Sequence, residues 1–363
     1  MDIVATLKEQ GLLPPKRLTI SITSNCNLRC EHCWVECDWL EKQGLYAPRA
    51  EVVRLIREFV DIGGEEICLT GGEPLTHPGF PDILGFCLDT ELQSVHLQTN
   101  ATLLDQEALQ GYASHDTRKL HFQVSLDGAS EETHDLVRGA GSFKSALTGL
   151  AALAAEGYGA RTTIGFTEMQ HNMHEVPKLL RLASTIGVGS VVGWSLVDFG
   201  KAQHTENLSS PTPEQYVNLL ELYQSDREFR AAYDRHGTFA AIEWFKGRDH
   251  SAGHACRFIE KPYLSASGKL YPCTLLQNDA YAAHDLYDRN LVHAIGEMCG
   301  DWGRLREESV KRSQEPGCLK DCRGARHCAG GCFARAVVDS DGQRRGEDRC
   351  RLRCAVYQWG RDN

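Results

Sequence analysis

The sequence of 363 residues predicts an α/β protein in which a parallel sheet is followed by a cysteine-rich region. From Arg17 to about Val197, short β-branched or apolar runs alternate with stretches whose apolar residues recur at helical spacing. Repeated β-α units of this kind imply a parallel sheet with right-handed crossovers. From about His250 the character changes, because nine of the fifteen cysteines lie between Cys256 and Cys354.

Six runs have the length and composition of strands, and four of the stretches between them have the spacing of helices. The strands are expected at residues 18–23, 66–70, 94–99, 120–126, 161–166 and 190–196. The helices are expected at residues 50–60, 80–88, 142–155 and 176–183. A Pro-rich turn at 208–213 ends the alternation, and a helical stretch follows from 214 to about 233. Such sheets bind ligands at the carboxyl ends of their strands, so motifs at those ends are candidate ligand-binding sites.

Composition and charge exclude several classes of protein. The net charge of -10 argues against a nucleic-acid partner, since binding to a phosphate backbone needs Lys and Arg surfaces. No apolar run approaches the roughly twenty residues that cross a bilayer, so no membrane partner is expected. The N-terminus has no basic segment leading into an apolar one, and a cytoplasmic location with reduced thiols follows. Clustered cysteines in a reducing compartment indicate metal or iron-sulfur ligation rather than disulfides.

Cys26, Cys30 and Cys33 directly follow the first expected strand in a Cx3Cx2C spacing. A cubane [4Fe-4S] cluster has four irons that each take a ligand, so a loop with three thiolates leaves one iron free to bind another molecule. A zinc knuckle is the alternative interpretation, because His32 or Cys37 would complete a tetrahedral site.

A second motif, Gly71-Gly72-Glu73-Pro74, ends the second expected strand. Two glycines allow a backbone to approach a ligand closely, and a carboxylate such as that of Glu73 accepts hydrogen bonds from an ammonium group. By itself this sequence is also a common turn.

A third motif spans residues 125–138, from the end of the fourth strand into a helix. Ser125 and Asp127 lie at the strand end, and Arg138 has the side chain that grips a carboxylate in two places. Ser130 also suits the N-cap of the helix, an interpretation that is compatible with a ligand site. Asn100, directly after the third strand, is a further candidate at a strand end.

Taken together, these motifs resemble the radical SAM superfamily, and within it the subgroup with a C-terminal SPASM extension. The resemblance spans nearly the whole chain and implies a partial (β/α)6 radical SAM barrel, with a cysteine-rich SPASM domain that carries Fe-S clusters. On this basis we expect an N-terminal extension at 1–16, the barrel at 17–207, a helical bridge at 208–250 and the auxiliary-cluster domain at 251–363.

The resemblance also implies cofactors and ligands. Cys26, Cys30 and Cys33 are expected to bind a [4Fe-4S] cluster whose open iron is chelated by S-adenosyl-L-methionine (SAM), which is cleaved by one electron to a 5'-deoxyadenosyl radical. The residues expected to contact SAM are His32, near the adenine, Gly71, Gly72, Glu73 and Pro74, at the amino group, Asn100, and Ser125, Asp127 and Arg138, at the carboxylate and ribose. His32 as a packed histidine without such a part is the alternative. The loop 197–202 resembles the adenine-side loop of the family and also suits an ordinary turn.

The C-terminal cysteines follow the seven-cysteine SPASM pattern closely, with one Cx3C pair where the family usually has Cx2C. By resemblance, two auxiliary [4Fe-4S] clusters are expected, which makes three clusters in all. One is held by Cys256, Cys273 and Cys332, and the other by Cys318, Cys322, Cys328 and Cys350. A pair of zinc knuckles remains the alternative for this region.

The first auxiliary set has only three thiolates, so its fourth iron is either open or closed by Cys354, Cys299 or His254. Cys68 and Cys87 fall in an expected buried strand and helix and are interpreted as core thiols. Cys37 lies within reach of the first loop but outside its spacing.

The resemblance implies an enzyme that abstracts a hydrogen atom from a peptide or protein substrate and oxidises it, for example to a thioether or carbon-carbon cross-link, while the auxiliary clusters take the electron. Radical SAM oxidation or decarboxylation of a small molecule or tetrapyrrole in cofactor biosynthesis is the alternative. Sulfatase-type formylglycine maturation is disfavoured, because Thr274 stands where such enzymes carry an acidic residue after Cys273, although Asp279 lies nearby. A non-enzymatic Fe-S electron carrier is disfavoured by the intact Glu73 and Arg138 motifs.

Two protein partners are also expected. Only about sixteen residues precede the first strand, too few for the precursor-recognition domain that many peptide maturases carry, so a separate leader-recognition protein is one way to bind a peptide substrate. A low-potential flavodoxin or ferredoxin is expected to supply the electron.

Overall fold

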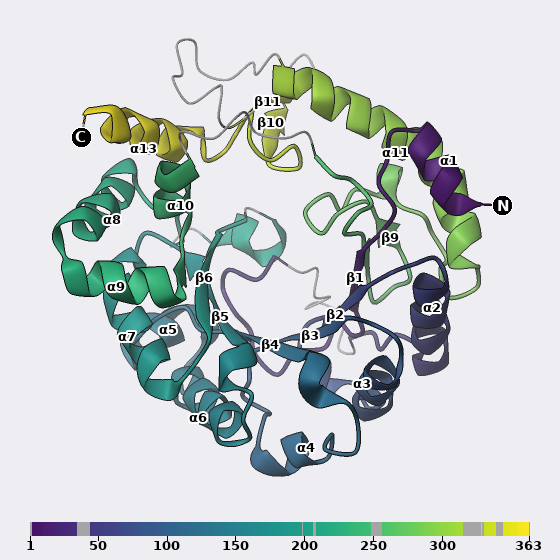
Figure 1. Cartoon of the computed structure of the whole chain (residues 1–363), viewed down its shortest axis with the longest axis horizontal. Coiled ribbons are helices and arrows are strands. Elements are labelled where there is room, and N and C mark those ends of the chain that lie inside the picture. Colours follow the sequence, from purple (N-terminus) through teal and green to yellow (C-terminus); the bar gives the residue numbers. More distant parts are fainter. Residues whose placement is uncertain are drawn as a thin grey trace.

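In the computed structural model, the chain curves into a ring of strands with helices on its outer side (Figure 1). The structure describes residues 2–34, 44–197, 199–205, 208–247, 256–314, 328, 330–338 and 344–362. Cys37, His254, Cys318 and Cys322 fall outside these residues, so the expectations for them stay predictions.

The six predicted strands are present and parallel, which confirms the expected fold class. They are β1 (Arg17–Ser21), β2 (Glu66–Thr70), β3 (Ser94–Thr99), β4 (Leu120–Ser125), β5 (Thr162–Glu168) and β6 (Ser190–Ser195). Neighbours in sequence are neighbours in the sheet, so each strand end faces the same edge. The carboxyl ends of all six strands therefore surround one site.

Helices cover the convex side of the sheet (Figure 1). Those between the strands are α2 (Arg49–Asp61), α3 (Phe80–Asp89), α4 (Gln106–Gln110), α5 (Glu131–Arg138), α6 (Ser142–Ala155) and α7 (Val176–Ile186). In α7, Val176, Leu179, Leu180 and Ala183 are buried at helical spacing, and the left-handed Gly187 (φ 84°) ends the helix.

The strands alternate between two environments. In β3, Val95 and Leu97 are buried in the main hydrophobic core, whereas His96 and Gln98 are half-buried on the opposite, inner face. The Gln98 amide donates to Gln123 Oε1 of β4 at 3.3 Å. The period-2 pattern therefore places an apolar face against the helices and a polar face inside the ring.

The sheet is larger than predicted, because both segments assigned outside the barrel add strands to it. β7 (Gly237–Thr238) pairs with β6, β8 (Tyr263–Leu264) pairs with β1, and β9 (Leu270–Tyr271) continues from β8. Strands of two residues give too weak a pattern to be predicted from sequence. The expected domain boundaries stay a prediction.

The C-terminal region also contributes large apolar side chains to the hydrophobic core. Trp302, Phe333 and Val356 are fully buried in the same hydrophobic cluster as the barrel residues. The helices outside the barrel are α1 (Ile3–Glu9), α8 (Pro213–Ser225), α9 (Arg227–His236), α10 (Ala240–Lys246), α11 (Leu291–Gln314) and α13 (Cys350–Asp362). Two short strands, β10 (Ala336–Val338) and β11 (Arg344–Glu347), form a hairpin.

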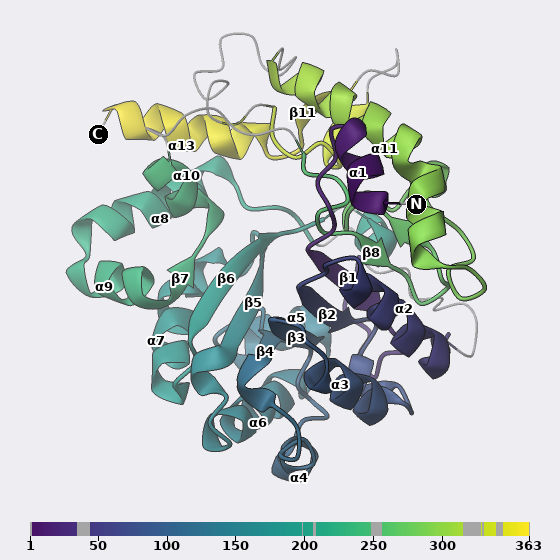
Figure 2. The same ribbon diagram turned by 45° about the vertical axis from the view of Figure 1, so that its right-hand side comes forward.

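The N-terminal helix α1 packs against α11, and α13 packs against α8 and α10 (Figure 2). These contacts join the C-terminal region to both edges of the barrel. No helix among the described residues has the length and apolar composition of a membrane span.

Two helical glycines test this packing. A Cβ on Gly149 of α6 would lie 2.2 Å from the carbonyl oxygen of Ala101, just after β3, so we expect Gly149→Ala to lower the free energy of unfolding by about 1–3 kcal/mol. Gly300 of α11 is exposed, and a Cβ there would meet only the side-chain end of Arg304 at 4.0 Å, so Gly300→Ala should raise the free energy of unfolding by about 0.5–1 kcal/mol. Urea unfolding of the cluster-free protein measures both, and equal effects at the two positions would contradict this account.

Candidate functional site

The loop with Cys26, Cys30 and Cys33 follows β1 at the carboxyl edge of the sheet. Cys30 is buried and the other two thiols are half-buried. Burial raises the pKa of Cys26 to about 12, and the charges of Cys30 and Cys33 act in the same direction, so the three thiols lie near enough to influence one another. The loop is tied to α5, because the Glu31 backbone N–H donates to the carbonyl of Val137 at 2.8 Å.

Gly71 and Gly72 bring the turn after β2 against the start of this loop. A Cβ on Gly71 (φ 154°) would lie 2.4 Å from the carbonyl oxygen of Thr23, and one on Gly72 would lie 2.2 Å from that of Asn25. Their close approach is therefore to the cysteine loop itself. Only glycine permits this approach, which fixes the turn beside Cys26.

Glu73, which follows these glycines, is almost fully buried. Its carboxylate accepts hydrogen bonds from the Thr99 hydroxyl and from the backbone N–H of Asn100, each at 2.7 Å. Burial raises the pKa of Glu73 to about 7, although these hydrogen bonds oppose the shift. The buried Pro74 then begins a short 3-10 turn. The second motif is thus joined to the end of β3.

Asn100 links the end of β3 to the cysteine loop. Its side-chain amide donates to Asn27 Oδ1 at 2.9 Å and lies 4.0 Å from the sulfur of Cys26. Its own Oδ1 accepts from the backbone N–H of Thr102 at 2.9 Å. These bonds hold Asn100 toward the loop, where the sequence predicted a strand-end contact.

Asp127, Arg138 and His32 form a buried charged group beside Cys30. Arg138 Nε donates to Asp127 Oδ2 at 2.6 Å, and His32 Nε2 lies 3.0 Å from the same oxygen. Arg138 Nη1 also lies 3.8 Å from the sulfur of Cys30. Burial favours a raised pKa for Asp127, but Arg138 and His32 together hold that pKa well below its usual range. Ser125, the half-buried last residue of β4, lies two residues before this group.

The surroundings of Asp127 include residues that the sequence did not single out. The backbone N–H of Thr167 donates to Asp127 Oδ1 at 2.6 Å, and the Asn172 amide donates to the Asp127 carbonyl at 3.0 Å. Glu175 accepts from the backbone N–H of Ala129 at 2.7 Å and from the Ser130 hydroxyl at 2.8 Å. The signal that was available is the position of Thr167 at the end of the fifth strand, and of Asn172 and Glu175 just after it, at the same sheet edge. Ser130 caps α5 as expected.

These residues fit a SAM-bound [4Fe-4S] cluster. Three neighbouring thiols supply ligands, and they share a loop with His32, whose buried Nδ1 has no partner among the described residues. A buried ring nitrogen without a partner is costly, and a bound group or an ordered water would satisfy it. Cys26, Cys30 and Cys33 would hold the cluster, with Glu73, Asn100, Ser125, Asp127 and Arg138 on the strand ends around it.

Cys256, Cys273 and Cys332 form a second group of thiols. Burial raises the pKa of Cys273 to about 12, and the charges of Cys332 and Cys256 reinforce that shift. The backbone N–H of Cys256 donates to the Ser309 hydroxyl at 2.8 Å, which anchors it on α11. The three residues that the sequence assigned to one auxiliary cluster thus influence one another electrostatically, and the assignment of a cluster to them stays a prediction.

The other C-terminal cysteines are less closely defined. Cys350 begins α13 and is half-buried, as are Cys328 and Cys354. Cys299, named as a possible fourth ligand, is buried in the core, and its thiol donates to the Ile295 carbonyl of its own helix. Cys68 and Cys87 are both fully buried in the core, as predicted.

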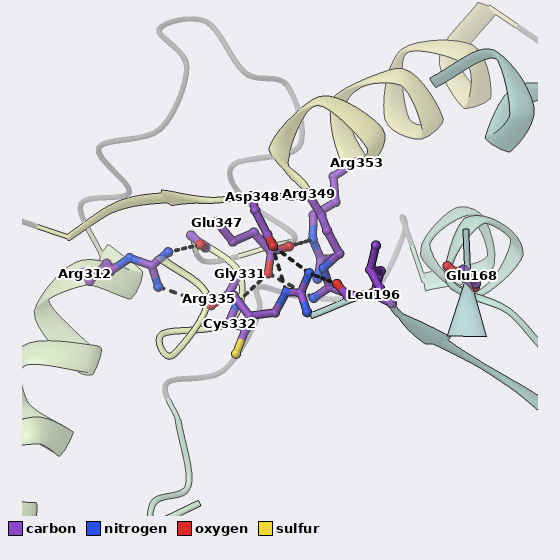
Figure 3. A network of polar contacts seen from close by, with 12 residues as sticks. Glu168, Leu196, Arg312, Gly331, Cys332, Arg335, Glu347, Asp348, Arg349 and Arg353 are labelled. Atoms are coloured by element: carbon purple, nitrogen blue, oxygen red, sulfur yellow. Dashed lines mark hydrogen bonds and ion pairs between the residues drawn. The ribbon is translucent and has the colours of Figure 1, made fainter. Parts of the chain in front are cut away.

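A dense network of arginines and carboxylates joins the Cys332 loop to the barrel (Figure 3). Arg335 donates to the Leu196 carbonyl at 2.6 Å, just after β6, and pairs with Asp348. Next to it lies a cavity of about 250 Å³, lined by Val197, Phe199, Leu275, Ala334, Arg335, Ala336 and Asp348. The cavity thus lies between the carboxyl end of β6 and the second thiol group.

Glu73 should make stability depend on pH. Its folded pKa of about 7 exceeds the ordinary value of 4.5, so the folded protein binds the proton more tightly and loses stability as pH rises between these values. Relative to Glu73→Gln, the wild-type protein should lose about 3 kcal/mol across this window. Urea unfolding of the cluster-free protein at several pH values measures the difference. Parallel profiles for the two proteins would rule out the shift.

Asp127 should be essential for local stability. Asp127→Asn leaves the guanidinium of Arg138 buried without its carboxylate, and we expect a loss of about 3–5 kcal/mol in the free energy of unfolding. Asp116→Asn is the control, since Asp116 pairs with Arg118 on the surface and its removal should leave the unfolding curve unchanged. An unchanged curve for Asp127→Asn as well would refute the argument.

Several known proteins are similar to this chain in sequence or in fold. The AdoMet-dependent heme synthase of Methanosarcina barkeri is 31% identical over 216 residues, which cover 59% of this chain and 59% of that protein. The mycofactocin maturase MftC of Mycobacterium ulcerans is 26% identical over 339 residues, covering 90% of this chain and 85% of that one. The crystal structure of Streptococcus suis SuiB bound to precursor peptide SuiA has a TM-score of 0.74 at 14% identity, covering 96% of this chain and 79% of that one, and this likeness shows the fold.

The family model for the radical SAM superfamily matches residues 20–183. This span runs from β1 through α7 and includes the Cx3Cx2C loop and each predicted SAM-contacting residue. Residues 20–183 are therefore a radical SAM domain, which is followed by a cysteine-rich region whose cysteine spacing resembles SPASM.

Proposed function

We propose that the protein is a radical SAM enzyme that removes a hydrogen atom from a peptide or protein substrate and modifies it oxidatively, with formation of a thioether or carbon-carbon cross-link. The observation that carries the proposal is the convergence of three motifs on one sheet edge. Cys26, Glu73 and the Asp127–Arg138 pair come from three different strand ends and meet beside a single loop.

The bound SAM and its [4Fe-4S] cluster would supply the one-electron cleavage that yields a 5'-deoxyadenosyl radical. The protein would hold the cluster through Cys26, Cys30 and Cys33. The buried carboxylate of Glu73 suits the SAM amino group, and Arg138 suits its carboxylate. Ser125 and Asn100 would limit where the ribose lies, and His32 offers its ring nitrogen to the adenine.

Two further features support a substrate oxidation. Cys256, Cys273 and Cys332, which influence one another electrostatically, would hold one auxiliary cluster, while Cys328 and Cys350 belong to the set proposed for a second. As the new bond forms, the substrate gives one hydrogen atom to the adenosyl group and then one electron and one proton, and the electron needs such an acceptor. A flavodoxin or ferredoxin would supply the first electron.

The similarity over nearly the full chain to MftC, whose name is that of a maturase, and the fold shared with a SuiB–peptide complex favour a peptide substrate. The polar inner face of the barrel, with Gln98 bonded to Gln123, offers amide groups that pair with peptide bonds. A separate leader-recognition protein would present the substrate. The identity to a heme synthase favours a tetrapyrrole as the second candidate, although it covers only 59% of the chain.

SAM cleavage tests the enzyme class. Anaerobically reconstituted protein should bind about twelve iron atoms and, with SAM and dithionite, release 5'-deoxyadenosine. Cys30→Ala should lose about a third of the iron and all cleavage, whereas Cys87→Ala, a core thiol outside the loops, should retain both. Wild-type protein that contains all its iron and still yields no 5'-deoxyadenosine would contradict the proposal.

Short Cys-, Ser- or aromatic-rich peptides encoded beside the gene, and iron coproporphyrin, then separate the two substrate classes. Mass spectrometry should show loss of two hydrogen atoms from the peptide and no change in the porphyrin. The reverse result would establish the tetrapyrrole alternative.

A further inference from the structure

A buried carboxylate lies directly behind one of the proposed auxiliary ligands. Glu347, the last residue of β11, has a fully buried side chain. Its Oε2 accepts the backbone N–H of Cys332 at 2.8 Å. A charged acceptor makes this hydrogen bond stronger than one to a neutral oxygen, so the bond fixes the peptide plane that precedes the Cys332 side chain.

Two arginines hold this carboxylate in place. Arg349 Nη2 donates to Glu347 Oε2 at 3.0 Å, and Arg353 Nε donates to Oε1 at 2.5 Å. Arg349 also donates through Nη1 to the Ser195 hydroxyl at the end of β6, at 2.8 Å. Both guanidinium groups lie over the ring of Trp244, at 5.3 and 3.9 Å from its centroid. Cys332 is thus connected through Glu347 and Arg349 to the last barrel strand (Figure 3).

The backbone before Cys332 is shaped to admit this carboxylate. Gly331 has a left-handed conformation (φ 73°), and a Cβ at that position would lie 2.3 Å from Glu347 Cδ. Any other residue would displace Glu347 or the cysteine loop. The glycine and the carboxylate therefore form one unit around the Cys332 amide.

The chemistry of this unit points to more than stability. A buried ionic network is often no more stabilising than apolar packing of the same volume, so stability alone does not explain why these charged residues are buried here. Groups that hydrogen-bond to a metal ligand on the side away from the metal fix the orientation of that ligand. Charges and hydrogen bonds around the sulfurs also set the reduction potential of an Fe-S cluster.

We propose that Glu347 is a positioning residue for the auxiliary centre. It fixes the Cys332 ligand relative to β6 through Arg349, and its charge, opposed by two arginines, sets the reduction potential of that centre. This inference rests on the proposed function, which assigns a cluster to Cys256, Cys273 and Cys332.

Three substitutions separate geometry from charge. Glu347→Gln keeps an oxygen that accepts the Cys332 N–H but removes the negative charge, so the auxiliary centre should bind and have a more positive potential. Glu347→Ala removes the acceptor as well, and a chelator should extract auxiliary iron roughly 10- to 100-fold faster. Asp301→Asn is the matched control, since Asp301 pairs with Arg304 on the exposed side of α11 and lies outside the Glu347 network; it should behave as wild type.

A glycine pair tests the same unit without altering its charge. Gly331→Ala and Gly330→Ala both place a side chain at a left-handed position, but only the first would strike Glu347, while the second approaches Arg312. Gly331→Ala should therefore speed the loss of auxiliary iron well beyond Gly330→Ala.

The readouts are iron content and an EPR-monitored redox titration of each reconstituted protein, with SAM cleavage followed in parallel. The first cluster and its SAM cleavage should be unchanged in the Glu347 variants, which shows that they fold. Wild-type iron release and auxiliary potential in Glu347→Gln and Glu347→Ala would overturn this inference. A wild-type protein that binds only about four irons would instead overturn the auxiliary part of the proposed function.

Discussion

The buried ion pair between Asp127 and Arg138 is the interaction on which the site depends. Asp127 is fully buried, and it meets Arg138 from the end of α5, His32 from the cysteine loop and the Thr167 backbone from β5. Each of these elements has its position fixed by one carboxylate. A buried charge without a partner would be very costly, so the folded state requires that the strand ends and the loop stay in contact with one another.

The same carboxylate shapes the electrostatics of the cysteine loop. Burial raises the pKa of the Cys30 thiol, and the positive charge of Arg138, 3.8 Å from the Cys30 sulfur, opposes that shift by favouring the thiolate that binds iron. Glu73 lies on the other side as a buried hydrogen-bond acceptor. Burial raises its pKa to about 7, which is close to neutral pH. A cationic group placed beside it would restore its charge. The two sides of the site therefore suit the two charged groups of an amino acid.

Beyond the barrel, a second charged unit repeats this arrangement. Glu347, like Asp127, is a fully buried carboxylate that is held by arginine and lies next to a cysteine. Arg349 carries the connection to Ser195 of β6, and Arg335 carries a parallel one to Leu196. Both attach to the strand that closes the six-stranded part of the sheet. The C-terminal region is thereby fixed to the barrel at the carboxyl edge, where the proposed chemistry takes place.

Much of this was readable from the sequence because it depends on local patterns. Alternating strand and helix periodicities predicted the six parallel strands, and the Cx3Cx2C spacing identified Cys26. Glu73, Asp127 and Arg138 were identified from short motifs through the family resemblance. The grouping of Cys256, Cys273 and Cys332 followed from a family resemblance rather than from spacing. Two-residue strands such as β7 and β8 carry no periodicity, so the nine-stranded sheet was not predictable.

Only the tertiary structure decided which partners meet. Arg138 could be placed on a helix but not against Asp127 and Cys30. The packing of Gly71 and Gly72 on the loop backbone at Thr23 and Asn25 was likewise visible only in the folded chain. Glu347 gave no signal, because a carboxylate fifteen residues beyond Cys332 looks like any surface residue until the chain folds back. Sequence determines local periodicity and which groups are available. Burial and long-range pairing, which assign those groups their charges and roles, arise only when distant segments share one core.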